Sequence, residues 1–506
     1  MRFLSSSRLG LMLAVFTFAM AGQEPGILTP PAPPQPRIHG ARMYGVRPGH
    51  PFLYRIPATG TRPITFSAKG LPKGLKLDKR SGIIGGTSPA RGEYKVKLRA
   101  RNSAGRTERA FTIVAGDKLA LTPPMGWSTW YMAHTDISDA MVRRQAEAMV
   151  TSRLADHGYA YVNIDDGWNI KPGSDDAALG GSARDAEGNL LSNKNFPDMR
   201  ALTDYIHSRG LKAGVYIGPG PLTCARFEGS YQHEEQDARR FAEWGFDFLK
   251  YDLCSYGRLM KDQNDAAELR KPYQLMGSIL GMLNRDFVFN LCEYGRGKVW
   301  EWGRAVGGNF WRTTGDVGGG RNADLWTNME RYGFGEAGLE KWAGPGGWND
   351  PDNVLIGQIL WRGKLVPTPL THNEQYTWVT LWSLLDAPLV FGGDMTRLDD
   401  FTLSLLTNDE VIEVNQDPLG RQATPVYKSG KVEVWAKGME DGSKAVGLFN
   451  RGEDEREVVA RWSDLGITGP QIVRDLWRQK DVGRADGEFR ANLGRHGAAL
   501  FRLRPE

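Results

Sequence analysis

Two aspartates end separate apolar segments that we interpret as buried strands. The first segment, "FDFLKYD", ends at Asp252, and the second, "NFWRTTGD", ends at Asp316. Side chains two apart on a strand share a face, so Lys250 should point the same way as Asp252, and Arg312 the same way as Asp316. Two carboxyl groups in different surroundings are what enzymes use to hydrolyse glycosidic bonds. The competing interpretation is two independent structural ion pairs, one on each strand.

The lysine next to Asp252 bears on the charge of that aspartate. A nearby positive charge lowers the pKa of a carboxyl group, so we expect Lys250 to keep Asp252 ionised, as a nucleophile requires. The same alternation places Phe248 on the inner face with Lys250 and turns Leu249 and Tyr251 toward the surrounding helices.

Segments of strand and helix character alternate from Leu119 to about Thr407 and position these residues. Repeated strand-then-helix order predicts a (β/α)₈ barrel of the α/β class, with a doubly wound sheet as the alternative. The eight candidate strands are "MGWSTW", "YAYVNIDDGW", "LKAGVYIG", "FDFLKYD", "FVFNLCE", "NFWRTTGD", "AGPGGWND" and "APLVFGGDM".

In a barrel, catalytic side chains lie at the carboxyl ends of the strands, on one rim. A single aspartate in that place is often only a helix cap. Carboxylates on at least five successive strand ends are harder to explain in that way, because unpaired buried charge is costly. The polar and aromatic residues at these ends are Trp130, Asp165, Asp166, Tyr216, Lys250, Asp252, Glu293, Arg312, Asp316, Asp350 and Asp352.

The sequence lacks the residues that other hydrolytic mechanisms need. A metal-dependent barrel hydrolase uses histidines clustered at strand ends, but only His134 of the eight histidines lies near one. No Gly-x-Ser-x-Gly elbow presents a serine nucleophile, and the "GGG" at 318–320 follows an acid rather than opening a phosphate-binding loop. We therefore expect neither a metal nor a cofactor.

The first 21 residues have the pattern of a secretory signal peptide. Two arginines precede an apolar run at residues 9–19, and Ala-Met-Ala follows at a position suited to cleavage. The run is too short to span a bilayer. We expect a secreted protein, periplasmic or extracellular, with no membrane span in the mature chain.

Composition divides the rest of the chain into four parts. Residues 22–37 carry six prolines and predict an extended, semi-rigid tether. Residues 38–116 contain alternating segments such as "GEYKVKLRARN" and predict a β-sandwich that resembles the small Ig-like domains of bacterial secreted enzymes. The catalytic barrel is expected at residues 117–418, and the short strands of residues 419–506 predict a C-terminal antiparallel β-sandwich.

The net charge bears on which partners the protein could bind, and the cysteine count limits the number of disulfides. Removal of the first 21 residues leaves 62 basic against 59 acidic side chains, a net charge of +3. Nearly balanced charge without a basic cluster gives no reason to expect a nucleic-acid partner. Cys224, Cys254 and Cys292 allow at most one disulfide. Nothing in the pattern bears on the oligomeric state.

With these residues in view, the chain from Leu119 to its end resembles glycoside hydrolase family 27, the α-galactosidases and α-N-acetylgalactosaminidases. The family has a (β/α)₈ barrel followed by an antiparallel β domain, in agreement with the pattern above. The motifs that carry the resemblance are, in family order, "LTPPMGWSTW", "GYAYVNIDDGW", "GVYIGPGPLTC", "FLKYDLC", "LCEYG", "FWRTTGDV", "GGWNDPDN" and "NQDPLG".

The resemblance implies a role for each residue of the rim. Asp252 corresponds to the nucleophile and Asp316 to the general acid/base of a retaining mechanism. Asp165 and Asp166 correspond to the pair that holds the 4- and 6-hydroxyls of galactose. The other correspondences are a tryptophan stacked beneath the sugar (Trp130), pocket residues (Tyr216, Lys250, Asp352), residues near the 2-hydroxyl (Glu293, Arg312), and a disulfide beside the active site (Cys224, which borders the substrate, with Cys254).

Several departures from the family leave the sugar open. Gly167 stands where many relatives have a disulfide-bonded cysteine, and Ile217 and Asn353 also depart from the common pattern. A β-L-arabinopyranosidase is one alternative, against which Asp166 argues because arabinopyranose lacks the C6 group. A non-catalytic carbohydrate-binding protein is another, which the presence of both carboxylates disfavours. We expect an oligo- or polysaccharide substrate with terminal α-galactose, since Glu293 is typical of galactosidases rather than of N-acetylgalactosaminidases.

Overall fold

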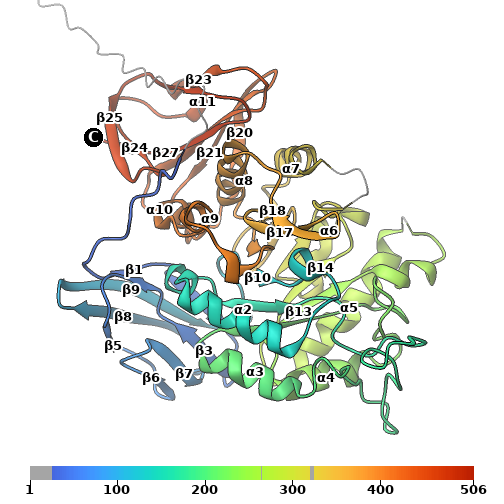
Figure 1. The fold of residues 1–506 in the computed structure, drawn as a ribbon. Coiled ribbons are helices and arrows are strands. Elements are labelled where there is room, and N and C mark those ends of the chain that lie inside the picture. The colour runs from blue at the N-terminus through green and yellow to red at the C-terminus, as the bar shows by residue number, and fades with distance from the viewer. Residues whose placement is uncertain (1–25, 264, 320–323) are drawn as a thin grey trace, which may run out of the picture.

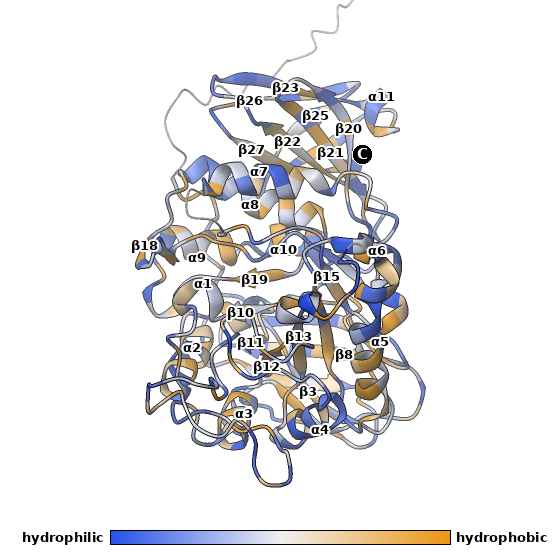
Figure 2. Cartoon of the chain, turned by 90° about the vertical axis from the view of Figure 1, so that its right-hand side faces the viewer, coloured by the Kyte–Doolittle hydropathy of each residue, from blue (hydrophilic) through white to orange (hydrophobic). Residues whose placement is uncertain are grey.

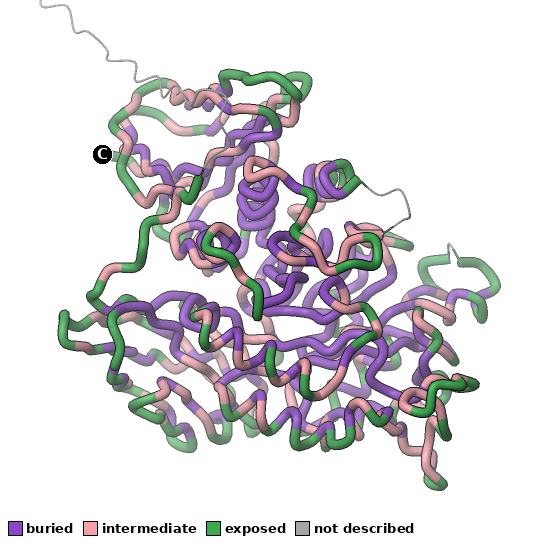
Figure 3. Tube along the Cα trace, in the orientation of Figure 1, coloured by how far each residue is buried: buried purple, intermediate pink, exposed green. Residues whose placement is uncertain are grey.

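The computed structural model describes residues 26–263, 265–319 and 324–506. The predicted signal peptide, residues 1–21, therefore lies outside the described residues. The chain forms a central barrel with a β-rich domain on either side, one from the N-terminal part and one from the C-terminal part (Figure 1). Figure 3 shows the buried residues concentrated in the barrel and the exposed ones in the outer loops.

Eight parallel strands form the barrel, and each lies within one of the predicted segments. The segment that follows strand β16 is joined to strand β19 by a parallel bridge between Val354 and Phe391. Here the amide of Val354 donates to the carbonyl of Val390 at 2.8 Å. This bridge closes the barrel. In spatial order the strands are β16 (Trp348–Asp350), β15 (Phe310–Arg312), β14 (Val288–Cys292), β13 (Phe248–Asp252), β12 (Lys212–Ile217), β11 (Tyr161–Ile164), β10 (Met125–Ser128) and β19 (Leu389–Phe391).

Helices connect these strands and cover the outside of the barrel. In α3, Met199, Leu202 and Ile206 are buried at helical spacing, and Asp198 caps its start by accepting from the amide of Ala201 at 2.9 Å. Figure 2 shows hydrophobic stretches in the barrel strands and hydrophilic ones in many loops. The helices are α1 (Trp130–Ala133), α2 (Asp139–Thr151), α3 (Met199–Ser208), α4 (Glu234–Trp244), α5 (Ala266–Met282), α6 (Val299–Trp302), α7 (Leu325–Gly333), α8 (His372–Leu384), α9 (Asp400–Leu406) and α10 (Asp409–Asn415).

The predicted alternation along β13 is confirmed. Phe248 packs inside the barrel in one cluster with Val288, Phe310 and Trp348. Tyr251 points outward and meets the ring of Tyr273 on α5, with the ring centroids 5.9 Å apart. The inner face of β13 therefore carries Lys250 and Asp252 toward the carboxyl end of the barrel.

Two small sheets and one further pair of short strands make up the N-terminal domain. In the long strand β8, Val96, Leu98 and Ala100 are buried and the residues between them are exposed, as the alternation predicted. One sheet contains β2 (Met43–Val46), β9 (Gly105–Ala115), β8 (Gly92–Asn102) and β5 (Thr65–Lys69); the other contains β3 (Pro51–Arg55), β7 (Ile83–Thr87) and β6 (Leu75–Leu77), and β1 (Arg37–Ile38) pairs with β4 (Ala58–Thr59).

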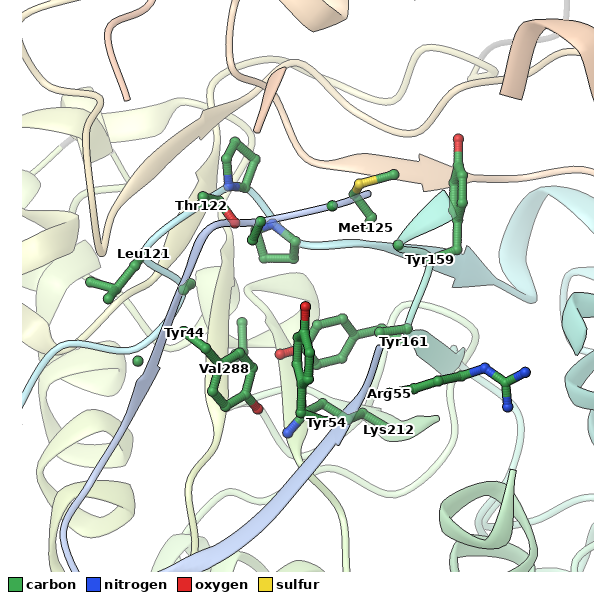
Figure 4. Close-up of a pocket in the computed structure, with 18 of the residues that line it drawn as sticks. Tyr44, Tyr54, Arg55, Leu121, Thr122, Met125, Tyr159, Tyr161, Lys212 and Val288 are labelled. Atoms are coloured by element: carbon green, nitrogen blue, oxygen red, sulfur yellow. The ribbon is translucent and has the colours of Figure 1, made fainter. Parts of the chain in front are cut away.

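This domain covers the amino ends of the barrel strands, which we call the base of the barrel. A cavity of about 110 Å³ lies between the two parts. In Figure 4, Tyr44 and Tyr54 of the N-terminal domain lie beside Tyr161 and Lys212, the first residues of β11 and β12. The cavity is therefore at the opposite end of the strands from the predicted catalytic residues.

The C-terminal domain packs against α8 and completes the predicted β-sandwich. Val434, Leu448, Val473 and Phe501 belong to its core. Its six-stranded sheet contains β20 (Thr424–Ser429), β21 (Val432–Gly438), β22 (Lys444–Asn450), β27 (Ala498–Pro505), β24 (Gln471–Asp475) and β25 (Lys480–Ala485), and a second sheet pairs β23 (Arg456–Arg461) with β26 (Glu488–Leu493), next to the short helix α11 (Trp462–Leu465).

The proline-rich segment is fixed to this half of the molecule. The hydroxyl of Tyr376 on α8 accepts from the amide of Leu28 and donates to the carbonyl of Gly26, both at 3.0 Å. The hydroxyl of Thr29 donates to the carbonyl of Ser404 on α9 at 2.9 Å. The described part of the segment thus runs along the barrel before it enters the N-terminal domain. Within the described ranges, no helix has both the length and the apolar character needed to cross a membrane.

Candidate active site

The predicted site residues come together at the carboxyl ends of the barrel strands, which we call the rim. The strand register places Lys250 opposite Tyr216 on β12 and Arg312 opposite Asp350 on β16. A cavity of about 30 Å³ within the barrel is lined by residues of several strands, among them Asp165, Lys250, Arg312, Asp350, Asp352 and Asn353. The rim is therefore one site rather than a set of separate turns.

Asp252 is buried and is held by two tyrosine hydroxyl groups. Tyr294 donates to its Oδ1 at 2.6 Å, and Tyr216 donates to its Oδ2 at 3.3 Å. Burial raises the pKa of Asp252 to about 6, although the charge of Lys250 and the Tyr294 hydrogen bond lower it. Lys250 lowers the pKa of Asp252, as expected, but desolvation by burial has the larger effect and was not foreseen.

Lys250 forms its ion pair with Asp165 and not with Asp252. Its Nζ lies 2.9 Å from Asp165 Oδ2 and 5.0 Å from the ring centre of Tyr216. Burial opposes a charged lysine, but the charge of Asp165, chiefly, raises the pKa of Lys250 above its ordinary value. Lys250 therefore stays protonated and links β13, which carries Asp252, to the segment that carries Asp165.

Arg312 joins two carboxylates. Its guanidinium lies 3.2 Å from Asp316 Oδ1 and 3.1 Å from Asp352 Oδ2, and Asp352 Oδ2 also accepts from the hydroxyl of Tyr131 at 2.5 Å and the amide of Val317 at 2.8 Å. The side chain of Asp316 is 39% exposed, whereas that of Asp352 is 4% exposed. Asp316 is therefore the member of this group that solvent or a substrate can reach.

The remaining sugar-contacting candidates also lie at the rim. Asp166 is buried and accepts from the hydroxyl of Thr223 and the amide of Ala225, both at 2.8 Å, and burial raises its pKa to about 7. Glu293 is fully buried, and burial raises its pKa well above the ordinary value. Trp130 begins α1 and remains partly exposed, as a platform for a sugar ring must be.

The predicted disulfide between Cys224 and Cys254 is confirmed and borders the nucleophile. The two Cα atoms are 4.9 Å apart. Cys254 Sγ lies 3.2 Å from the Tyr216 hydroxyl, and Cys224 Sγ lies 3.4 Å from the Tyr294 hydroxyl. These sulfurs and Asp252 lie within 4.8 Å of one another, but both sulfurs are used in the disulfide, so this group is not a set of metal ligands.

Sequence reasoning missed two tyrosines that hold the acidic residues. Tyr294 follows Glu293 beyond the end of β14, with φ at +64°, so strand alternation could not predict its direction. Tyr131 lies in the first turn of α1 and reaches Asp352 across the barrel. The motif "LCEYG" contained Tyr294, and only its position in that motif could have marked it.

The two carboxylates that sequence analysis paired have unlike environments. Asp252 is buried and bound by neutral hydroxyl donors, whereas Asp316 is partly exposed and bound by a guanidinium. Such a difference assigns separate roles to two carboxyl groups, one that attacks and one that exchanges protons. The arrangement is suited to displacement at a sugar carbon with proton transfer to the leaving oxygen.

Comparison with known proteins supports the same kind of chemistry at a sugar carbon. Residues 122–417 match the family model "Alpha galactosidase A", residues 429–503 match "Alpha galactosidase C-terminal beta sandwich domain", and residues 41–116 match an Ig domain. An α-galactosidase of Cyamopsis tetragonoloba is 39% identical over 397 residues, which cover 78% of this chain and 88% of that protein. Alpha-galactosidase A of Cellvibrio japonicus is 36% identical over 414 residues, covering 77% and 93%.

A solved structure extends the similarity to the N-terminal domain. A Bacteroides fragilis protein assigned to the α-galactosidase/melibiase class superposes with a TM-score of 0.84 at 35% identity, covering 93% of this chain and 98% of that one. The similarity therefore reaches beyond the barrel and the C-terminal sandwich.

Proposed function

The chain belongs to the α-galactosidases of glycoside hydrolase family 27, and from this premise we propose that it removes terminal α-D-galactosyl residues with retention of anomeric configuration. Asp252 is the nucleophile and Asp316 the general acid/base. The observation that carries the assignment is the contrast between a buried Asp252 held by two tyrosines and a partly exposed Asp316 held by Arg312.

The reaction proceeds in two displacements. An oxygen of Asp252 attacks C1 of the galactosyl unit while the bond from C1 to the leaving oxygen breaks, and Asp316 gives that oxygen its proton. In the second step Asp316 takes a proton from water, the water oxygen bonds to C1, and the bond between C1 and Asp252 breaks. Asp252 is released as a carboxylate and galactose leaves in the α form.

Recognition of galactose rests on the side of the rim formed by β11. We assign the pair Asp165 and Asp166 to the 4- and 6-hydroxyls, with Lys250 fixed beside them by its bond to Asp165. Galactose differs from glucose at the axial 4-hydroxyl, and a site built to bind that group leaves its buried acceptors unpaired with the wrong sugar. Glu293 and Arg312 are assigned to the 2-hydroxyl and Trp130 to the apolar face of the ring.

Azide rescue separates the two catalytic roles. With 4-nitrophenyl α-galactoside, wild type should be active, and Asp252→Ala should lose at least roughly 10⁴-fold in kcat. Azide should then yield the β-galactosyl azide with Asp252→Ala and the α-galactosyl azide with Asp316→Ala, because it replaces the nucleophile in one case and water in the other. An inactive wild type, or exchanged azide anomers, would overturn the assignment.

The sugar and the location need separate measurements. The ratio of kcat/KM on 4-nitrophenyl α-galactoside and on the matching β-L-arabinopyranoside decides between the two glycosides, and we expect the galactoside to be preferred. We also propose that the protein is secreted, supported by the pattern of residues 1–21 and by the disulfide beside the site. N-terminal sequencing of exported protein should begin at Gly22; retention of the full chain in the cytoplasm would contradict this.

A further inference from the structure

Tyr294 makes the shortest hydrogen bond that the structure gives to Asp252. Its hydroxyl donates to Oδ1 at 2.6 Å, whereas the hydroxyl of Tyr216 donates to Oδ2 at 3.3 Å. Each oxygen of the carboxylate thus has one tyrosine donor. A tyrosine hydroxyl has a single proton, and an ionised carboxylate is a far stronger acceptor than a disulfide sulfur. The neighbouring sulfur of Cys224, 3.4 Å from the same hydroxyl, therefore limits where the hydroxyl can lie rather than competing for its proton.

The backbone at Tyr294 is held in a conformation that a bulky residue seldom adopts. Its φ is +64°, in the left-handed region that strains a residue other than glycine. The next residue, Gly295, has φ +78°, and a Cβ there would lie 2.2 Å from the carbonyl oxygen of Thr313. The chain therefore makes a tight left-handed corner directly after β14, and this corner returns the Tyr294 ring to Asp252.

We propose that Tyr294 is a positioning residue that keeps the nucleophile's charge available for attack and makes its carboxylate a better leaving group in the second displacement. The inference rests on the function proposed above, since it requires Asp252 to be the nucleophile. It adds a residue that neither strand alternation nor the expected set of sugar contacts included.

The chemistry explains why one hydroxyl affects the two displacements differently. A donor to the carboxylate stabilises its negative charge, which slightly weakens it as a nucleophile in the first step. In the second step the same charge reappears on the departing oxygen as the bond between C1 and Asp252 breaks, so the donor accelerates that step. Loss of Tyr294 should therefore slow hydrolysis of the galactosyl-enzyme more than its formation.

The test compares Tyr294→Phe with wild type on 4-nitrophenyl α-galactoside. A hydrogen bond to a charged group supports a loss of roughly tenfold or more in the hydrolysis step. When that step limits turnover, kcat and KM fall together while kcat/KM changes less. Because the Tyr294 hydrogen bond also lowers the pKa of Asp252, the acid limb of the kcat/KM profile should move up by about one pH unit in the variant.

Tyr256→Phe is the matched control. Tyr256 lies in the turn Cys254–Arg258 next to the same disulfide, and no described hydrogen bond joins its hydroxyl to Asp252. It should keep the wild-type profile. If Tyr294→Phe keeps the wild-type acid limb and the wild-type values of both kcat and KM, this inference fails while the proposed function stands. If wild type does not hydrolyse the galactoside, or Asp252→Ala is fully active, the proposed function itself fails.

A structure of the wild-type galactosyl-enzyme provides a second test that does not depend on a folded variant. The 2-deoxy-2-fluoro galactosyl adduct on Asp252 should show the Tyr294 hydroxyl within hydrogen-bond distance of an ester oxygen. A hydroxyl displaced beyond about 3.5 Å would overturn the proposed role in the second displacement.

Discussion

The base and the rim of the barrel each bury a carboxylate on or next to β13, but the hydrogen-bond partners of the two carboxylates differ in charge. At the base, Asp247 precedes β13 and lies 2.7 Å from both His207 Nε2 and Arg285 Nη2. At the rim, Asp252 ends the same strand and is bound by two neutral tyrosine hydroxyls. One strand thus carries a structural carboxylate before its first residue and a reactive one at its last.

The pKa values of the two groups move apart accordingly. Burial alone would raise the pKa of Asp247, but the hydrogen bond and charge of His207, with the charges of Lys212 and Arg285, hold it well below the ordinary range. Burial raises the pKa of Asp252 to about 6, and the charge of Lys250 and the hydrogen bond of Tyr294, which lower it, do not offset this effect. The difference indicates that the kind of partner, more than burial itself, separates a structural carboxylate from a reactive one.

Asp247→Asn, at the base, should have a larger effect on stability than any single substitution at the rim. It leaves Arg285 and His207 without a charge partner, and breaking a buried ion pair costs about 3–5 kcal/mol. We expect the lower end, because Arg285 is 17% exposed. Urea unfolding should show this loss, and kcat on the galactoside should stay within about twofold of wild type. Loss of activity at full stability would show that the base takes part in catalysis.

Removal of the disulfide tests how much this covalent bond contributes to the rim around Asp252. Cys224 and Cys254 are 30 residues apart, and the chain-entropy account gives about 3–4 kcal/mol for closing a loop of that size. The double variant Cys224→Ala, Cys254→Ala should lose stability by about 2–4 kcal/mol in thermal unfolding. Its kcat should also fall, because the sulfurs border both tyrosine hydroxyls. Wild type treated with reductant is the control, and a stable, fully active double variant would contradict the prediction.

Asp252→Asn should stabilise the protein by a smaller amount, with a defined pH dependence. The folded-state pKa of about 6 exceeds that of an unfolded aspartate, so the folded protein binds more protons between about pH 4 and pH 6 and loses stability as the pH rises through that window. The neutral variant escapes this loss and should gain about 1–3 kcal/mol at pH 8, with the gain fading toward pH 4.

Asp247 should show the opposite pH dependence. Its lowered pKa contributes stability that is present above the unfolded pKa and is lost as the pH falls toward the folded value. The cost of Asp247→Asn should therefore shrink in acid while the gain from Asp252→Asn also shrinks. Unfolding curves of wild type and both variants from pH 4 to pH 8 check the pair. A stability difference from wild type that stays constant with pH in either variant would break the comparison between base and rim.

Much of the barrel could be predicted because its strands carry local signals. The alternation in "FDFLKYD" was enough to predict that Lys250 and Asp252 point into the barrel. The strands β6 and β7 were missed because "LKL" is only three residues long and "IIGGT" ends in two glycines and a threonine, so neither carries a clear strand signal of its own. Their strand conformation depends on pairing with β3.

Sequence reasoning predicted which residues form the candidate site better than it predicted the contacts between them. Sequence reasoning paired Lys250 with Asp252, but the barrel places Asp165 within 2.9 Å of the lysine from another strand. It could not find Tyr294, because side-chain directions were predicted from strand alternation and the left-handed backbone at Tyr294 breaks that alternation. It predicted that Lys250 lowers the pKa of Asp252 but not the larger opposite effect of burial, because desolvation depends on every element that packs around the carboxyl group.

The sequence by itself determined the family, the order of strands and helices, the two carboxylates and the disulfide, because these depend on residue types and spacings along the chain. The tertiary structure decided which cation meets which carboxylate, how deeply Asp252 is buried, and that the N-terminal domain covers the base. These depend on distances between residues far apart in sequence, and the electrostatic energies that separate a structural carboxylate from a nucleophile change steeply with such distances.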